Sequence, residues 1–126
     1  MKSFITAIII TITLVTCSIA YNSHLTNESQ ELFNTTHAIS VFINNDDFNG
    51  AEDEIKKLRE KVAEFEDFFL ATGNHAEIDS IETNMAELES YINSEMKSNA
   101  LAKVNVLKFL FAHLPESVGL SIANIL

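Results

Sequence analysis

The sequence contains no tryptophan, one proline, three glycines and a single cysteine, Cys17. With so few residues that interrupt helices, the composition favours helix throughout. A single cysteine excludes an intrachain disulfide, so the folded part must be stabilised by packing alone. Basic residues are also scarce, with 8 Lys and Arg against 18 Asp and Glu, a formal net charge of −10. This imbalance opposes binding to nucleic acid or to an anionic membrane surface through charge.

An apolar segment, Phe4 to Ala20, follows Lys2, and no comparable run occurs before the closing residues. A positive charge, an apolar stretch and the small residues Ser18 and Ala20 are typical of an export signal that is cleaved after Ala20. The same stretch reaches the short end of the roughly 17 to 25 residues that span a membrane. Residues 1–20 therefore fit both a signal peptide and an N-terminal membrane anchor, and both predict an extracytoplasmic location for the rest.

Cys17 adds a third fate, lipidation. Residues 14–16, Leu-Val-Thr, precede it and resemble a bacterial lipobox, although Gly, Ala or Ser normally stands in the place of Thr16. Residues 18–21 are also less polar than the usual tether after a lipidated cysteine. The sequence is therefore compatible with cleavage of residues 1–20, with their retention as an anchor, and with lipidation at Cys17.

Residues 21–126 predict a single helical domain. Cleavage would leave 106 residues with 7 basic and 18 acidic side chains, hence a net charge of −11, and this length suits one hydrophobic core. Apolar residues recur at helical spacing in four stretches: over 23–43, from Asp47 to Gly73, from Asn74 to about 92, and from about 100 to Pro115. The predicted core positions are Leu25, Leu32, Thr36, Ile39 and Ile43; Phe48, Ala51, Ile55, Leu58, Val62, Phe65 and Phe69; Ile78, Ile81, Met85, Leu88 and Ile92; and Leu101, Val104, Leu107 or Lys108, Phe111 and Leu114.

Short connections separate these helices. Residues 44–47 favour a turn and an N-cap, Gly73 favours a helix end, and Asn74 with Glu77 resembles a capping box. Because short connections make neighbouring helices antiparallel, we expect an all-α fold, either a four-helix up-down bundle or paired helical hairpins, preceded by an N-terminal hydrophobic leader helix. The second connection and the end of the fourth helix would then return beside the leader, and three histidines would gather there: His24, His75 and His113.

The spacing of apolar residues changes in the tail, residues 115–126. Apolar and small residues alternate over 117–122, as they do in an extended segment. We expect an apolar C-terminal strap that packs on the bundle and covers Phe68 and Phe109. If such apolar residues stayed uncovered, they would form an interaction surface for a membrane protein or another copy.

Three blocks occur in a specific order and spacing. They are Asp47-Phe-Asn-Gly-Ala51, then His75-Ala-Glu-Ile-Asp79 followed by Ile81, and finally His113-Leu-Pro-Glu116 with residues 120–126. Together they resemble a small exported family of Gram-positive bacteria, domain of unknown function 4363, over nearly the whole chain. The resemblance implies an N-terminal anchor or signal, an all-helical body, and no established activity, substrate or cofactor. Phenylalanine at 48, 68 and 69 stands where the family commonly has tryptophan, which keeps the packing role.

Histidine and carboxylate side chains at one predicted end of the bundle are the candidates for a metal site, because both bind divalent metals. The candidates are His75, Glu77, Asp79, His113 and Glu116, with His24 close by. Their spacing matches no metal motif. Helix capping explains the same residues with fewer assumptions, with Asn74 and Glu77 at the start of the third helix and His113 at the end of the fourth. We therefore predict no metal site and no cofactor.

Acidic clusters could in principle supply paired carboxylates for hydrolysis. Glu64, Glu66 and Asp67, or Glu87 and Glu89, lie off the apolar positions, as a solvated helix face does, and no nucleophile, base and orienting group can be assembled. We therefore expect that the protein is not an enzyme. The sequence favours a non-enzymatic accessory module, tethered at the outer membrane face, that contacts a membrane protein or its own kind. The alternative is an extracytoplasmic domain that binds a metal or small ligand at the His75 and His113 end.

Overall fold

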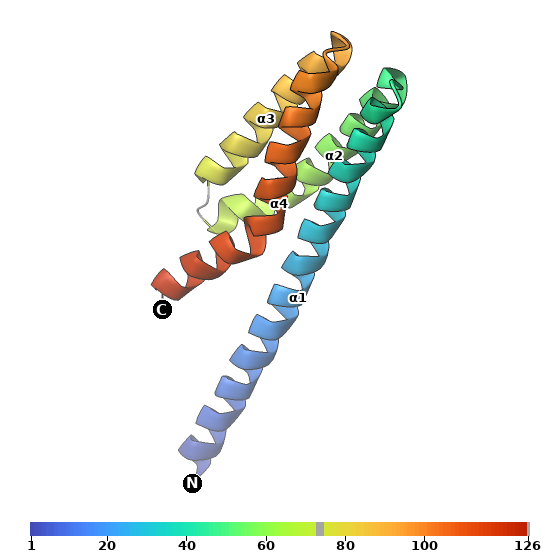
Figure 1. Cartoon of the computed structure of the whole chain (residues 1–126). Helices are drawn as coiled ribbons and strands as arrows, with labels where there is room; N and C mark the ends of the chain where they lie inside the picture. The colour runs from blue at the N-terminus through green and yellow to red at the C-terminus, as the bar shows by residue number, and fades with distance from the viewer. Residues whose placement is uncertain (73–74, 126) are drawn as a thin grey trace.

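The computed structural model of the protein describes residues 1–72 and 75–125, without the side chains of Phe69, Thr72 and 117–125. In these ranges the chain forms four helices, α1 (Lys2–Asn44), α2 (Phe48–Thr72), α3 (His75–Asn93) and α4 (Lys97–Ile125). Each helix runs antiparallel to the one before it (Figure 1). Helices α1 and α3 each pack against both α2 and α4. The predicted all-α up-down bundle is confirmed.

Most of the predicted apolar positions form the core of the bundle, whereas Phe48 and Leu101 are only partly buried and pack against it. All five predicted positions of α1 and all five of α3 are buried. In α4, Leu107 is fully buried and Lys108 only half-buried, which settles that alternative. Ser29 and Ala100 are buried as well and were not predicted. Phe69, Gly73 and the capping residue Asn74 lie outside the described residues or side chains.

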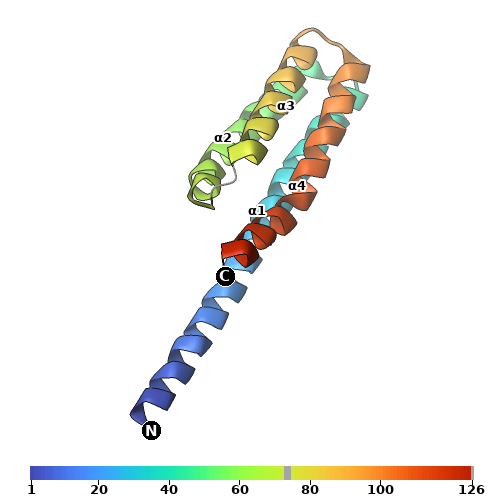
Figure 2. The ribbon, with the colours of Figure 1, turned by 90° about the vertical axis from the view of Figure 1, so that its left-hand side faces the viewer.

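The helix α1 begins at Lys2, which confirms the predicted hydrophobic leader helix, and there is no separate helix start near residue 23. The apolar leader and the first bundle helix are one continuous helix of 43 residues. Residues 1–20 are all exposed and project beyond the bundle (Figure 2). By length and composition, this part of α1 could cross a membrane. Its four threonine hydroxyls each donate a hydrogen bond to the carbonyl four residues earlier, which lowers the cost of placing them in lipid.

The α1–α2 and α3–α4 turns share one geometry. Asp46 and Glu95 take the left-handed conformation, with φ of 57° and 53°. In each turn two amides donate back into the preceding helix: Asp46 to Ile43, Asp47 to Phe42, Glu95 to Ile92, and Met96 to Tyr91. This bonding pattern is the Schellman motif, in which glycine is the usual left-handed residue. Lys97 joins the two turns, because its Nζ lies 2.9 Å from Asp46 Oδ1 and 3.1 Å from the carbonyl oxygen of Asn44.

Glu95→Gly is expected to stabilise the protein by about 0.5–1 kcal/mol, because a left-handed conformation is unfavourable for a residue with a Cβ atom and free of that cost for glycine. Chemical unfolding of the full chain in mild detergent, followed by circular dichroism, would measure the change. Ser94→Gly is the matched control, since Ser94 lies in the same turn and lacks a positive φ. A loss of stability in Glu95→Gly, equal to that of the control, would contradict the expectation.

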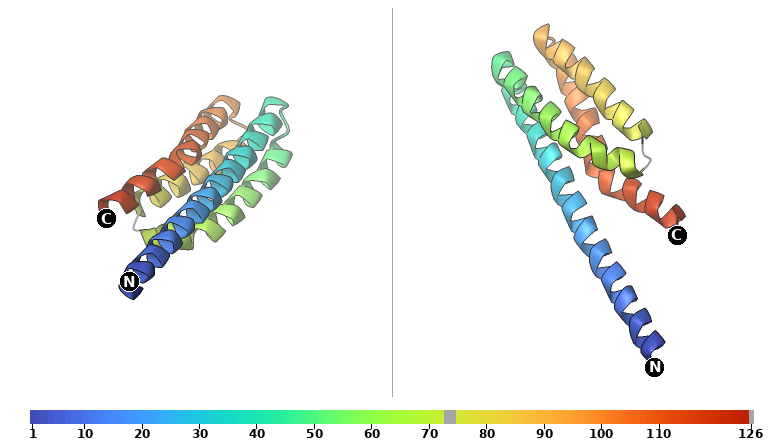
Figure 3. Two further views of the ribbon diagram at one scale, coloured as in Figure 1. Left: turned by 90° about the horizontal axis from the view of Figure 1, so that it is seen from below. Right: turned by 180° about the vertical axis from the view of Figure 1, so that it is seen from behind.

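The helix α4 does not end at Pro115. Pro115 lies inside the helix, which continues to Ile125, so the prediction of an extended strap over 115–126 is wrong. Phe109 stays 61% exposed, so it is not covered as expected. Phe68 is half-buried, but beside Tyr21 and Phe65. Beyond Pro115 the helix diverges from α1 (Figure 3).

Pro115 removes one hydrogen bond from α4. Proline has no amide hydrogen to donate to the carbonyl four residues earlier, here that of Phe111, and its ring crowds that carbonyl. The hydroxyl of Ser29, buried on α1, donates to the Phe111 carbonyl oxygen instead. A side chain of one helix thus satisfies the backbone group that a proline frees in another.

Candidate interaction site

The predicted histidine and carboxylate candidates are not brought together. His24 lies on α1, exposed, with its Nδ1 3.6 Å from Glu28 Oε1. His75 and Asp79 are exposed and Glu77 is half-buried, all in the first turns of α3. Across residues 1–72 and 75–125, no group of three or more His, Cys, Asp or Glu side chains could hold a metal ion. The metal-binding alternative therefore stays a prediction that no observed grouping supports.

His113 has a different role from the predicted helix cap. Because α4 continues for twelve residues to Ile125, His113 does not lie at its end. Its ring packs on Phe109, with the ring centroids 4.2 Å apart, and its Nδ1 lies 2.8 Å from the Phe109 carbonyl oxygen. Nδ1 must carry the proton to make this hydrogen bond. Glu116, the other candidate on α4, is exposed.

Two of the acidic residues considered for hydrolysis form ion pairs between helices. Glu89 on α3 pairs with Arg59 on α2, and Glu87 on α3 pairs with Lys103 on α4. Other pairs form within a single helix, such as Lys56 with Glu52 at 2.9 Å. These carboxylates therefore stabilise contacts between neighbouring helices.

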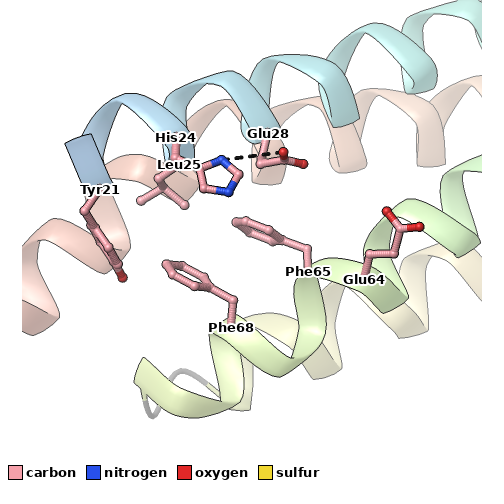
Figure 4. A pocket seen from close by; sticks show the side chains of 7 residues that line it. All are labelled: Tyr21, His24, Leu25, Glu28, Glu64, Phe65 and Phe68. Atoms are coloured by element: carbon pink, nitrogen blue, oxygen red, sulfur yellow. Dashed lines mark ion pairs between the residues drawn. The ribbon is translucent and has the colours of Figure 1, made fainter. Parts of the chain in front are cut away.

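A pocket of about 190 Å³ lies where α1 meets α2, next to the apolar start of α1. Figure 4 shows its seven lining side chains, which come from two short stretches of the chain. They are Tyr21, His24, Leu25 and Glu28 from α1, and Glu64, Phe65 and Phe68 from α2. Tyr21 directly follows the apolar segment, so the pocket lies beside the point where that segment ends.

Three aromatic rings form one side of this pocket. The ring centroids of Tyr21 and Phe68 are 5.1 Å apart, and those of Phe65 and Phe68 are 5.3 Å apart. These separations are typical of favourable aromatic pairs. Burial raises the pKa of the Tyr21 phenol above its usual value, so this ring stays neutral at physiological pH. The three rings therefore offer an uncharged and largely apolar surface.

The charged side chains of the pocket are mainly acidic. Glu28 and Glu64 line it, and no Lys or Arg does. The nearby Lys61 is paired with Glu31 of α1, and this hydrogen bond is the main cause of its raised pKa, with smaller Coulombic contributions from Glu64 and Glu28. Aromatic faces with neighbouring carboxylates attract groups that are both apolar and positively charged. The pocket is therefore suited to a basic or aromatic side chain of a partner.

Sequence reasoning missed this pocket, although a signal for it was present. Tyr21 lies four residues before the core residue Leu25, and Phe68 three residues after the core residue Phe65. Each ring therefore lies on the apolar face of its helix, one turn beyond a core residue, and both turns lie towards the same end of the bundle. The predicted antiparallel order of the two helices would have placed these rings together.

Comparison with known proteins gives a family and nothing more specific. Neither the curated proteins nor the solved structures contain a significant match to this chain. The matching family model spans all of α2, α3 and α4, together with α1 from residue 19. Since residues 19–125 match the model described as Domain of unknown function (DUF4363), the chain belongs to that family.

Proposed function

We propose that the protein is a non-enzymatic extracytoplasmic accessory module that is held at the membrane surface by the start of α1. Its bundle would contact a membrane protein or a second copy. The observation that carries this proposal is the continuity of α1, which is exposed and mainly apolar from Phe4 to Ala20 and contributes buried core residues from Leu25 onwards. A helix of this kind joins a membrane segment to a folded body without a linker.

The distribution of basic residues supports an extracytoplasmic bundle. Lys2 precedes the apolar segment, and the next basic residue after it is Lys56. Lys and Arg close to a membrane segment favour the cytoplasmic side, while acidic residues have little effect. The N-terminus is therefore expected in the cytoplasm and the bundle on the opposite side.

The aromatic pocket supports a contact close to the membrane. Its α1 residues, Tyr21 to Glu28, lie within about 12 Å of Ala20 along the helix at 1.5 Å per residue. A partner that reaches it must therefore present side chains near the membrane surface, as a membrane protein does.

The ion pairs of Glu87 and Glu89 support a non-enzymatic role, because these carboxylates are engaged in contacts between helices.

The tether can be tested by intact mass measurement on the native protein from washed membranes and from the medium. We expect the full chain of 14.0 kDa in the membrane fraction, since the apolar part of α1 remains attached. Cys17→Ser, which removes the only possible lipidation site, should be retained equally well. A chain that lacks residues 1–20 in the medium, or retention lost in Cys17→Ser, would contradict a tether formed by α1.

The contact can be tested by placing a photo-crosslinking residue at His24, an exposed position at the pocket. We expect crosslinks to a membrane protein or to a second copy. Asn49 is the matched control, because it is also exposed but lies at the start of α2, at the far end of the bundle. Equal crosslinking from both positions, or none from His24, would count against the proposed contact.

A further inference from the structure

The last part of α4 lies at the end of the bundle from which the apolar part of α1 projects (Figures 1 and 2). Pro115 and Glu116 line one shallow surface depression together with Asn22, Ser23 and Thr26 of α1. These α1 residues begin two positions after Ala20, the end of the apolar segment. The tail of α4 therefore starts within a few Å of the level at which α1 would enter a membrane.

The direction of the tail changes at that level. Up to Pro115, α4 packs along α1, and beyond it the helix diverges sideways from the axis of α1 (Figure 3). The bend has a local cause, because Pro115 cannot donate to the Phe111 carbonyl and the Ser29 hydroxyl donates to it instead. If α1 crosses the membrane, a helix that leaves it sideways at this level runs along the membrane surface.

The composition of the tail fits that location. Residues 117–126 contain no Asp, Glu, Lys or Arg, in a chain that has 26 such residues in all. Val118, Ile122 and Ile125 recur at helical spacing within it. Ten residues are too few to span a membrane, which takes about 20, and stretches of this length are typical of interfacial or buried segments. A helix that is uncharged and partly apolar can bury one side at the boundary between headgroups and acyl chains.

We propose that residues 117–125 are a second membrane contact, lying in the bilayer interface beside the point where α1 enters. This inference rests on the proposed function, since it requires the start of α1 to be in the bilayer. We take lipid as the contacting partner because the tail leaves the bundle at the level of the membrane and has no charged side chain to keep it in water. Since the tail also has no basic residue, its binding depends on apolar burial and should be insensitive to salt and to lipid charge.

The absence of tryptophan allows a direct test, because a single introduced tryptophan is the only one in the chain. The full chain is reconstituted into phosphatidylcholine vesicles, with and without lipids that carry bromine on their acyl chains, which quench tryptophan on contact. Ile122→Trp reports the tail, and Ile125→Trp is a second reporter if the first alters folding. Ile12→Trp reports the apolar part of α1. Val106→Trp is the matched control, since it is an exposed apolar position on α4 before Pro115.

We expect brominated lipid to quench Ile12→Trp and Ile122→Trp and to leave Val106→Trp unchanged, in low and in high salt. Quenching of Ile12→Trp without quenching of either tail reporter would overturn the second contact and leave the α1 tether intact. No quenching of Ile12→Trp would overturn the tether itself. Blue-shifted but unquenched emission from the tail reporters would mean that protein covers the tail, from the same chain or a second copy, and would also overturn the inference.

Discussion

Phe111→Ala is expected to lower the free energy of unfolding by about 3–5 kcal/mol, the range observed when a buried phenylalanine is truncated. Phe111 is completely buried at the centre of α4, so its removal leaves a cavity among packed side chains. Phe109, two residues earlier on the same helix, is 61% exposed. Phe109→Ala should change the same free energy by less than about 1 kcal/mol, because little apolar surface is buried there.

Chemical unfolding of both variants in the same detergent would measure this difference. The pair is well matched, since residue type, helix and substitution are identical and only burial differs. Comparable losses in the two variants would mean that Phe109 is covered in the folded protein. That result would point to a protein contact on this face of α4 and contradict the exposure described above.

Ser29→Ala is expected to destabilise the protein by about 1–3 kcal/mol, the cost of leaving a buried polar group without a hydrogen bond. The group concerned is the Phe111 carbonyl, to which Ser29 donates. In a Pro115→Ala background, residue 115 regains an amide hydrogen that can donate to this carbonyl within α4. The loss caused by Ser29→Ala should then fall below about 1 kcal/mol.

The four proteins of this double-mutant cycle would be compared by chemical unfolding. A coupling energy of about 1–2 kcal/mol between positions 29 and 115 is expected for groups that share one acceptor. Thr36→Ser is a suitable control, because the Thr36 hydroxyl is also buried but donates within α1, to the Leu32 carbonyl. This substitution should cost the same with proline or alanine at 115. An equal effect of Ser29→Ala in both backgrounds would contradict the compensating role of Ser29.

The helices and their buried faces could be predicted because both depend on periodicity. Positions such as Ile55, Leu58 and Val62 repeat at three and four residues, and only a helix buries all of them on one side. Spacing alone did not decide between Leu107 and Lys108, since either residue continued it. Burial of a Lys requires a partner for its charge, and that requirement favours Leu107.

The ends of the outer helices could not be predicted in the same way. In the tail, Val118 and Ile122 fit both an alternating pattern and a helical spacing of four, so periodicity alone could not decide. Pro115 was expected to end α4, because the compensating donor, Ser29, lies on another helix, 82 residues before Phe111, whose carbonyl it bonds. The left-handed conformation of Asp46 and Glu95 could not be predicted either, since glycine usually occupies such positions.

If the apolar part of α1 spans a membrane, as proposed, the unbroken helix would transmit any change in its tilt to the whole bundle. From Tyr21 to Asn44 the helix rises roughly 36 Å at 1.5 Å per residue. Bilayers of different thickness tilt their helices by different amounts, and a further tilt of about 10° would displace the distal turns sideways by about 6 Å. Because no hinge separates the apolar segment from the core, this displacement would reach every element of the bundle. The lateral position of the distal turns would thus follow the thickness of the membrane below.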